Sequence, residues 1–177
     1  MPTSADTLLL DTSAALALIN PEHPAHTAVA EATAGRRLGL AGHAVFETLS
    51  AGTRLPPPNR LSGADALRLI EENFPDSRFL SAQAAADALR RFVAKGVVGG
   101  AVWDGLVAAT AREHNLTLLT CDRRAQPTYE AVGAAYTLVT SYPHLHAVAD
   151  HCDANQQVVR PAAPDTSKRL DSELSGQ

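Results

Sequence analysis

Short apolar runs alternate with longer stretches of helical periodicity along the first 140 residues of the chain. Apolar runs typical of strands occupy residues 8–10, 38–40, 78–80, 116–120 and 136–139. Helical patterns with capping residues or terminal Gly and Pro lie between them, at residues 14–19, 23–34, 44–54, 62–73, 81–93 and 101–115 and around Tyr129. This alternation predicts an α/β fold whose strands pair in parallel through right-handed crossovers.

The periodic apolar pattern ends near Pro143. The chain has 177 residues, of which 45% are hydrophobic, so one domain with a sizeable core is expected over residues 1–143. Residues 144–177 are polar and predict a disordered tail. The tail carries His144, His146, His151 and Asp153, but regular metal-ligand spacing is missing, and surface histidines are the better interpretation.

Two cysteines, Cys121 and Cys152, form neither a disulfide framework nor a CxxC pattern, which fits a reducing cytoplasm. The sequence has no signal peptide and no apolar run long enough to span a membrane. We therefore expect a cytoplasmic protein with no membrane association.

The net charge of −4 argues against a protein that grips nucleic acid with a broad basic face. Small basic clusters such as Arg90-Arg91 and Arg123-Arg124 remain, and most charge runs of this kind are solvated helix faces. A local rim that binds phosphate stays open as an alternative.

Four acidic residues stand where predicted elements end or begin. Asp11 and Asp122 each follow a predicted strand, Asp104 opens a predicted helix, and Glu47 lies inside another helix among apolar neighbours. Each alone has a structural explanation, as a helix cap or a favourable charge at a helix start. Together they point to one site, because the carboxyl ends of parallel strands meet at one edge of a sheet.

Four carboxylates at one edge need protons or cations between them. Two such charges about 4 Å apart repel by roughly 4 kcal/mol at an effective dielectric near 20. An oxygen-only donor set selects Mg²⁺, for which Mn²⁺ can substitute. Such an ion activates water and stabilises the leaving oxygen in phosphodiester hydrolysis, so the pattern predicts a nuclease.

Two other classes of function stay open on the residues alone. In a metal-dependent phosphatase or phosphotransfer domain, Asp11 would accept the phosphoryl group, but Ser13 stands where such enzymes need a second Asp. An inactive domain could instead bind a partner in a groove between helices.

The segments around the four acids resemble the motifs of PIN domain ribonucleases, and among them the VapC-type toxins of bacterial toxin-antitoxin pairs. These segments are residues 9–14, 46–50, 103–111 and 119–122, and the resemblance covers about residues 7–140. It implies a three-layer α/β/α sandwich with a mainly parallel central sheet, Mg²⁺-dependent cleavage of RNA, inhibition by a small cognate antitoxin, and a homodimer. A solitary RNA-processing nuclease of the same family is the alternative biological role.

Carried over by position, the resemblance makes Asp11, Asp104 and Asp122 the metal ligands. Glu47 would bind metal or orient the attacking water. Hydrogen bonds that support these acids would come from the hydroxyl side chains of Thr12, Ser13 and Thr120.

The chain departs from the family pattern in a few places. Arg124 and Ala125 stand where many relatives have an acid and an aromatic residue, which weakens the case for a second tightly held ion. Trp103 and Gly105, which flank the third acid, are milder changes. We expect Trp103 to pack in the core, and stacking on an RNA base is the alternative.

Overall fold

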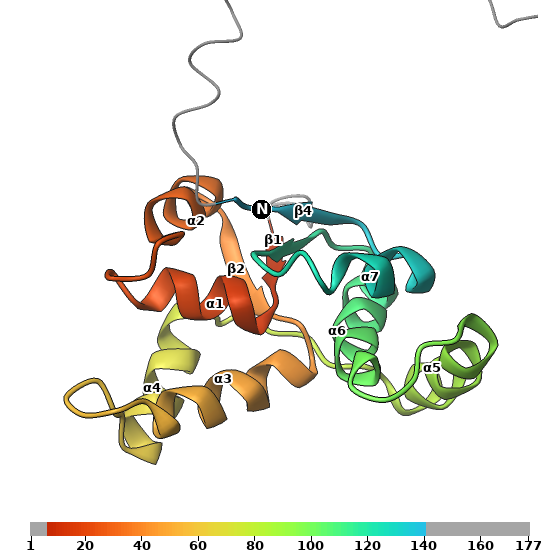
Figure 1. The fold of residues 1–177 in the computed structure, drawn as a ribbon, viewed down its shortest axis with the longest axis horizontal. Coiled ribbons are helices and arrows are strands. Elements are labelled where there is room, and N and C mark those ends of the chain that lie inside the picture. The colour runs from red at the N-terminus through yellow and green to blue at the C-terminus, as the bar shows by residue number, and fades with distance from the viewer. Residues whose placement is uncertain (1–6, 141–177) are drawn as a thin grey trace, which may run out of the picture. The chain divides into compact units, whose positions relative to one another are not determined.

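The structure is a computed structural model, and it describes residues 7–140. Within this part of the chain, strands and helices alternate largely as predicted (Figure 1). The strands are β1 (Thr7–Leu10), β2 (Arg37–Leu40), β3 (Leu118–Thr120) and β4 (Tyr136–Leu138). The helices are α1 (Thr12–Ile19), α2 (His26–Thr33), α3 (His43–Arg54), α4 (Gly63–Asn73), α5 (Ala82–Lys95), α6 (Ala101–Glu113) and α7 (Gln126–Val132).

The four strands form one all-parallel sheet in the order β2-β1-β3-β4. The chain moves in one direction from β1 to β2 and in the other direction for the remaining strands. Right-handed crossovers therefore put the helices after β1 and those after β3 on opposite faces, and Figure 1 shows α1 and α2 on one side of the strands and α6 and α7 on the other. The predicted three-layer sandwich is confirmed.

The strand order reverses between β1 and β3, which are neighbours in the sheet. In open α/β sheets this reversal leaves a crevice beyond the carboxyl ends of the two strands, and ligands bind there. α3 packs against both α1 and α6, so it reaches from one helical layer toward the other.

The sheet centre is dry because the strands that form it carry apolar side chains on both faces. All four residues of β1 are buried, and Leu9, Leu10, Leu118 and Leu119 are almost inaccessible to solvent. Continuous apolar runs of this kind are typical of parallel strands covered on both sides. A rigid sheet therefore holds the residues that follow β1 and β3.

A second apolar cluster joins α5 to α6. Phe92 of α5 is buried, and its ring lies against the backbone of Gly105 in α6. A methyl group at Gly105 would come within 2.9 Å of the Phe92 ring. The small residue after Asp104, a departure from the family pattern, thus has a structural reason.

One predicted strand is wrong. Residues 78–80 form no strand, and only one bridge, between Ala41 and Arg78, joins this segment to the sheet. The apolar pair that suggested a strand misleads, because Phe79 is half exposed. The backbone of the preceding residues runs close along β2, where a Cβ at Gly39 would overlap the carbonyl of Asp76.

A second difference concerns the start of α1. The sequence pattern predicts a helix over residues 14–19, but α1 begins at Thr12, because Asp11 is the N-cap and its carboxylate accepts the Ala14 amide. Ser62 and Ser81 cap α4 and α5 as predicted, and Gly96 ends α5 in the left-handed conformation at φ 71°.

The predicted tail, residues 144–177 with its histidines, lies outside the described residues. Among residues 7–140, no helix is long and apolar enough to cross a membrane.

Candidate active site

The four predicted acids are brought together at the carboxyl edge of the sheet. Asp11 follows β1 directly, Asp122 lies two residues beyond Thr120 at the end of β3, Asp104 is in the first turn of α6, and Glu47 is in α3. Burial raises the pKa of Asp104, and the negative charges of Asp122, Glu47 and Asp11 raise it further. The other three acids therefore lie near enough to Asp104 for their charges to act on its carboxyl group.

Asp11 is the most enclosed of the four, with 5% of its surface exposed. Its Oδ1 accepts hydrogen bonds from the Ser13 hydroxyl at 2.7 Å and from the Ala14 amide at 2.8 Å, and its Oδ2 accepts one from the Tyr129 hydroxyl at 3.0 Å. Burial nevertheless raises the pKa of Asp11, although hydrogen bonds from Thr120, Ala14, Ser13 and Tyr129 act to lower it. A cation beside Asp11 would favour its ionised form.

Hydroxyl groups tie the ends of β1 and β3 together. The Ser13 hydroxyl accepts the Cys121 amide at 2.8 Å and lies 3.5 Å from the Thr120 hydroxyl, which accepts the Asp122 amide at 3.0 Å. Burial and the charge of Asp11 raise the pKa of Cys121 to about 11, so its thiol stays protonated at neutral pH. Ser13 and Thr120 thus lie where supporting hydrogen-bond partners are predicted.

Thr12, the third predicted supporting residue, contacts a different acid. Its hydroxyl donates to Glu47 Oε2 at 2.7 Å, and His43 Nε2 lies 3.6 Å from Glu47 Oε1. Glu47 is half-buried, so the long side chain is held in one orientation toward the cluster. This pair also fixes α3 to the start of α1.

Asp122 is held by the segment that follows it. Its Oδ1 accepts the Arg124 amide at 2.8 Å, and the Arg124 guanidinium lies 3.6 Å from the same oxygen. The Arg124 side chain is almost fully exposed. Where many relatives have an acid, this chain therefore presents a positive charge at the rim of the cluster.

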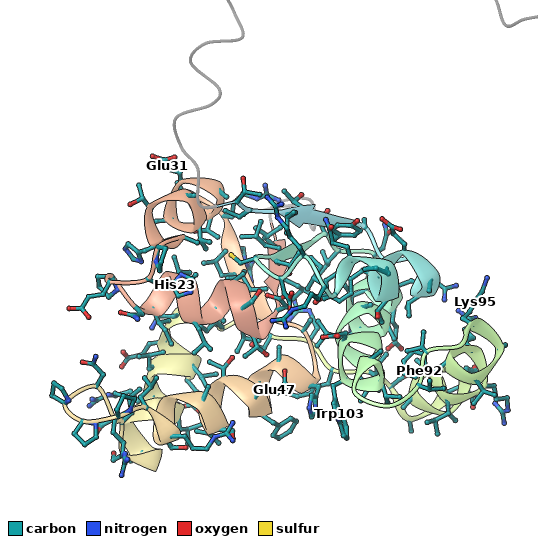
Figure 2. All side chains as sticks on the ribbon, viewed as in Figure 1. His23, Glu31, Glu47, Phe92, Lys95 and Trp103 are labelled. Atoms are coloured by element: carbon teal, nitrogen blue, oxygen red, sulfur yellow. The ribbon has the colours of Figure 1, made fainter. Side chains whose placement is uncertain are left out.

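Trp103 does not pack in the core, which corrects the sequence prediction. It is 51% exposed, and its ring stacks on His43 with centroids 4.6 Å apart and planes 17° from parallel. In Figure 2, Glu47 and Trp103 lie on the same side of the molecule, with Glu47 on α3 and Trp103 on α6. Trp103 therefore borders the acidic cluster.

The donor chemistry fits a hydrated hard cation. No group of three or more Asp, Glu, His or Cys side chains within residues 7–140 is arranged as a cage that could hold a metal ion. Mg²⁺ does not need such a cage, because it keeps several waters and binds through one or two carboxylates. The negative charges of the neighbouring acids raise the pKa of Asp104. A bound cation would neutralise these charges.

Two residues of the site are missing from the sequence prediction, Tyr129 and His43. Tyr129 lies on α7, 1% exposed, and packs edge-on against Tyr136 while it donates to Asp11. Its position in a short apolar helix is typical of a core residue and carries no local sign of a polar contact. The sequence does weakly indicate a contact between His43 and Glu47, because His43 precedes Glu47 by one helical turn.

A separate groove lies between α5, α6 and α7 and contains none of the four acids. Its volume is about 690 Å³, and its walls include small apolar residues of all three helices. The charged residues at its lining are Asp87, Arg91, Lys95, Arg112, Glu113 and Glu130.

The fold agrees with what comparison with known proteins finds. The PIN domain family matches residues 8–131. The chain therefore belongs to the PIN domain family.

Within that family the chain is similar to ribonucleases of the VapC type. It is 44% identical to Ribonuclease VapC27 of Mycobacterium tuberculosis over 126 residues, which are 71% of this chain and 92% of the relative. It is 37% identical to Ribonuclease VapC40 of the same species over 132 residues, which are 73% of this chain and 97% of that relative.

Solved structures show the same fold. FitAcB from Neisseria gonorrhoeae matches with a TM-score of 0.51 at 22% identity, over 73% of this chain and 95% of that one. VapBC2 from Rickettsia felis, bound to a DNA fragment from their promoter, matches with a TM-score of 0.55 at 15% identity, over 75% of this chain and 98% of that one.

Proposed function

We propose that this protein is a Mg²⁺-dependent endoribonuclease and the toxin of a toxin-antitoxin pair. The observation that carries the proposal is the cluster of four carboxylates, in which Asp122, Glu47 and Asp11 all raise the pKa of Asp104. The cluster lies at the edge where α/β sheets bind ligands. The similarity to VapC ribonucleases supports RNA as the substrate.

Asp11, Asp104 and Asp122 would hold the ion, Asp122 directly or through a water. A bound Mg²⁺ supplies a Lewis acid that activates water and stabilises charge on the leaving oxygen. Glu47 would bind the metal as well or orient the attacking water, since its carboxylate is fixed by Thr12.

Hydrogen bonds from neighbouring residues fix the orientation of Asp11, Glu47 and Asp122 in the absence of substrate. Ser13, the Ala14 amide and Tyr129 hold Asp11, and the exposed guanidinium of Arg124 stands beside Asp122, where it can contact a substrate phosphate. The phosphotransfer alternative gains no support, because Ser13 occupies the position of the second acid.

Purified protein should cleave RNA with Mg²⁺ or Mn²⁺ and stop when a chelator is added. Asp11→Asn and Asp104→Asn should each lower the cleavage rate at least about 100-fold, because each removes a charge that the ion needs. The matched controls are Asp65→Asn and Glu31→Gln, which change exposed acids on α4 and α2 and should leave the rate unchanged. Cleavage that survives both site substitutions would contradict the mechanism.

The biological role has its own test. Expression of the wild type should arrest growth, and co-expression of the short reading frame next to its gene should restore it, whereas Asp11→Asn should be harmless. Nuclease activity without any inhibitory neighbour would favour a solitary RNA-processing enzyme.

The expected homodimer remains a prediction. Leu89 and Val93, one turn apart on α5, and Val98 are exposed to 62%, 78% and 66%, and such an apolar stripe supports a protein contact on this helix. Light scattering of the wild type and of Val93→Glu would test it, with a monomeric variant as the expected outcome.

A further inference from the structure

We propose that the stacked rings of Trp103 and His43 form a platform for an unpaired base of the RNA, beside the carboxylate cluster. This inference rests on the proposed ribonuclease function and assigns two aromatic side chains a role in positioning its substrate. The pair joins two elements of the site, since His43 is on α3 and Trp103 is on α6.

Both rings are fixed to the cluster by their neighbours. His43 lies one helical turn before Glu47 and 3.6 Å from its carboxylate, and Trp103 directly precedes Asp104 in α6. Their centroids lie 4.6 Å apart with nearly parallel planes. A base stacked on this pair would hold its phosphate near the acids.

Part of the Trp103 ring surface is accessible for stacking with a base. Its residue is 51% exposed although the imidazole covers one face of the indole, so much of the accessible area belongs to the other face and the edges. An exposed tryptophan costs free energy in water that a stacked ligand recovers. Bases stack on aromatic side chains with little regard for sequence, because each base has a flat π face.

The aromatic surface extends beyond this pair. Phe46 follows His43 by three residues on α3, so the two side chains are neighbours on one helix face. Phe46 is 59% exposed and its ring lies 6.0 Å from that of Phe79, which is 50% exposed. A row of aromatic residues next to a carboxylate cluster suits a strand of RNA with consecutive unpaired bases.

Trp103 is the single tryptophan of the chain, so its fluorescence reports on this position alone. The experiment uses the full chain as Asp11→Asn, which does not consume the RNA, and titrates it with a short single-stranded oligoribonucleotide. We expect saturable quenching of Trp103. An oligomer of the same length with abasic positions, which keeps the phosphates, should quench less and bind about fivefold or more weakly.

Substitution separates stacking from general packing. Trp103→Ala should weaken binding of a labelled oligomer about fivefold or more, and Trp103→Phe should recover most of the affinity. Leu67→Ala on α4, where the apolar residue is 50% exposed, is the matched control and should change nothing. Circular dichroism of each variant checks that the fold is kept.

Three results would overturn the platform: equal binding of the abasic oligomer, binding of RNA without any change in Trp103 fluorescence, or equal affinities of the wild type and Trp103→Ala. A dependence of the fluorescence on protein concentration without RNA, with a lower mass for Trp103→Ala, would instead make this surface a protein interface. These readouts need no cleavage, so failure of the nuclease assay in the wild type is a separate result.

Discussion

At the scale of a single residue, Asp11 has two roles. Its carboxylate caps α1 by accepting the Ala14 amide, and it is also the most buried acid of the proposed metal site. The same charge therefore stabilises a helix and costs free energy through burial. Neither role alone explains why an acid stands here.

Substitution can separate the two roles of Asp11. Asp11→Asn keeps a good N-cap and removes the charge, whereas Asp11→Ala removes both, at a cost of about 0.5–2 kcal/mol for the lost cap. Both variants should lose cleavage, but only the alanine variant should lose the free energy of the cap, measured by urea unfolding in the absence of Mg²⁺. Equal unfolding free energies of the two variants would contradict the capping role.

The acids themselves could be predicted from the sequence, because a parallel sheet places residues after its strands at one edge. Tyr129 could not, since its contact with Asp11 spans 118 residues and depends on how α7 lies against the sheet. The exposure of Trp103 was also missed, because an apolar residue inside a helical pattern does not show which face meets solvent. Contacts between distant segments are thus what the sequence pattern leaves open.

At the scale of the elements, α5 packs so closely on α6 at Gly105 that a larger side chain there would overlap the Phe92 ring. Gly105→Ala would place a methyl group 2.9 Å from the Phe92 ring, so the ring or one of the helices must shift. We expect a loss of about 1–3 kcal/mol of unfolding free energy. Phe92→Leu in the same chain should recover part of this loss, because the smaller side chain leaves room for the methyl group.

The measurement for this pair is a double-mutant cycle by chemical denaturation. Gly63→Ala is the matched control, since a Cβ there meets no atom within 4 Å. Additive effects of Gly105→Ala and Phe92→Leu would contradict the proposed contact.

Most helices and strands were predictable because their apolar periods and caps agree. The exception at residues 78–80 has a clear cause. The segment before it follows the edge of β2 through backbone hydrogen bonds of Asp76 and Arg78, and Asp76 pairs with Arg37 at 2.6 Å, so polar contacts and not an apolar strand hold this chain in place.

At the scale of the whole molecule, repulsion within the acidic cluster lowers the stability of the folded protein when the acids are ionised. The pKa values of Asp11 and Asp104 are raised in the folded protein, so folding favours their protonated forms. Without metal, these groups therefore stabilise the folded protein fully at a pH below their unfolded pKa of about 4. This stabilisation is lost as the pH rises through their folded values. A divalent ion should reverse this loss.

Mg²⁺ should therefore raise the melting temperature of the wild type at neutral pH by several degrees, since binding at about 100 times Kd is worth about 2.7 kcal/mol. The rise should shrink at a pH low enough to protonate the cluster. Asp11→Asn should show little rise, and scanning fluorimetry with and without a chelator measures the effect. An equal rise in the variant would place the ion elsewhere.

The link between the ends of β1 and β3 has a consequence during synthesis. Asp11 is synthesised more than 100 residues before Thr120 and Asp122. A nascent chain thus carries no complete catalytic centre until nearly the whole domain has emerged.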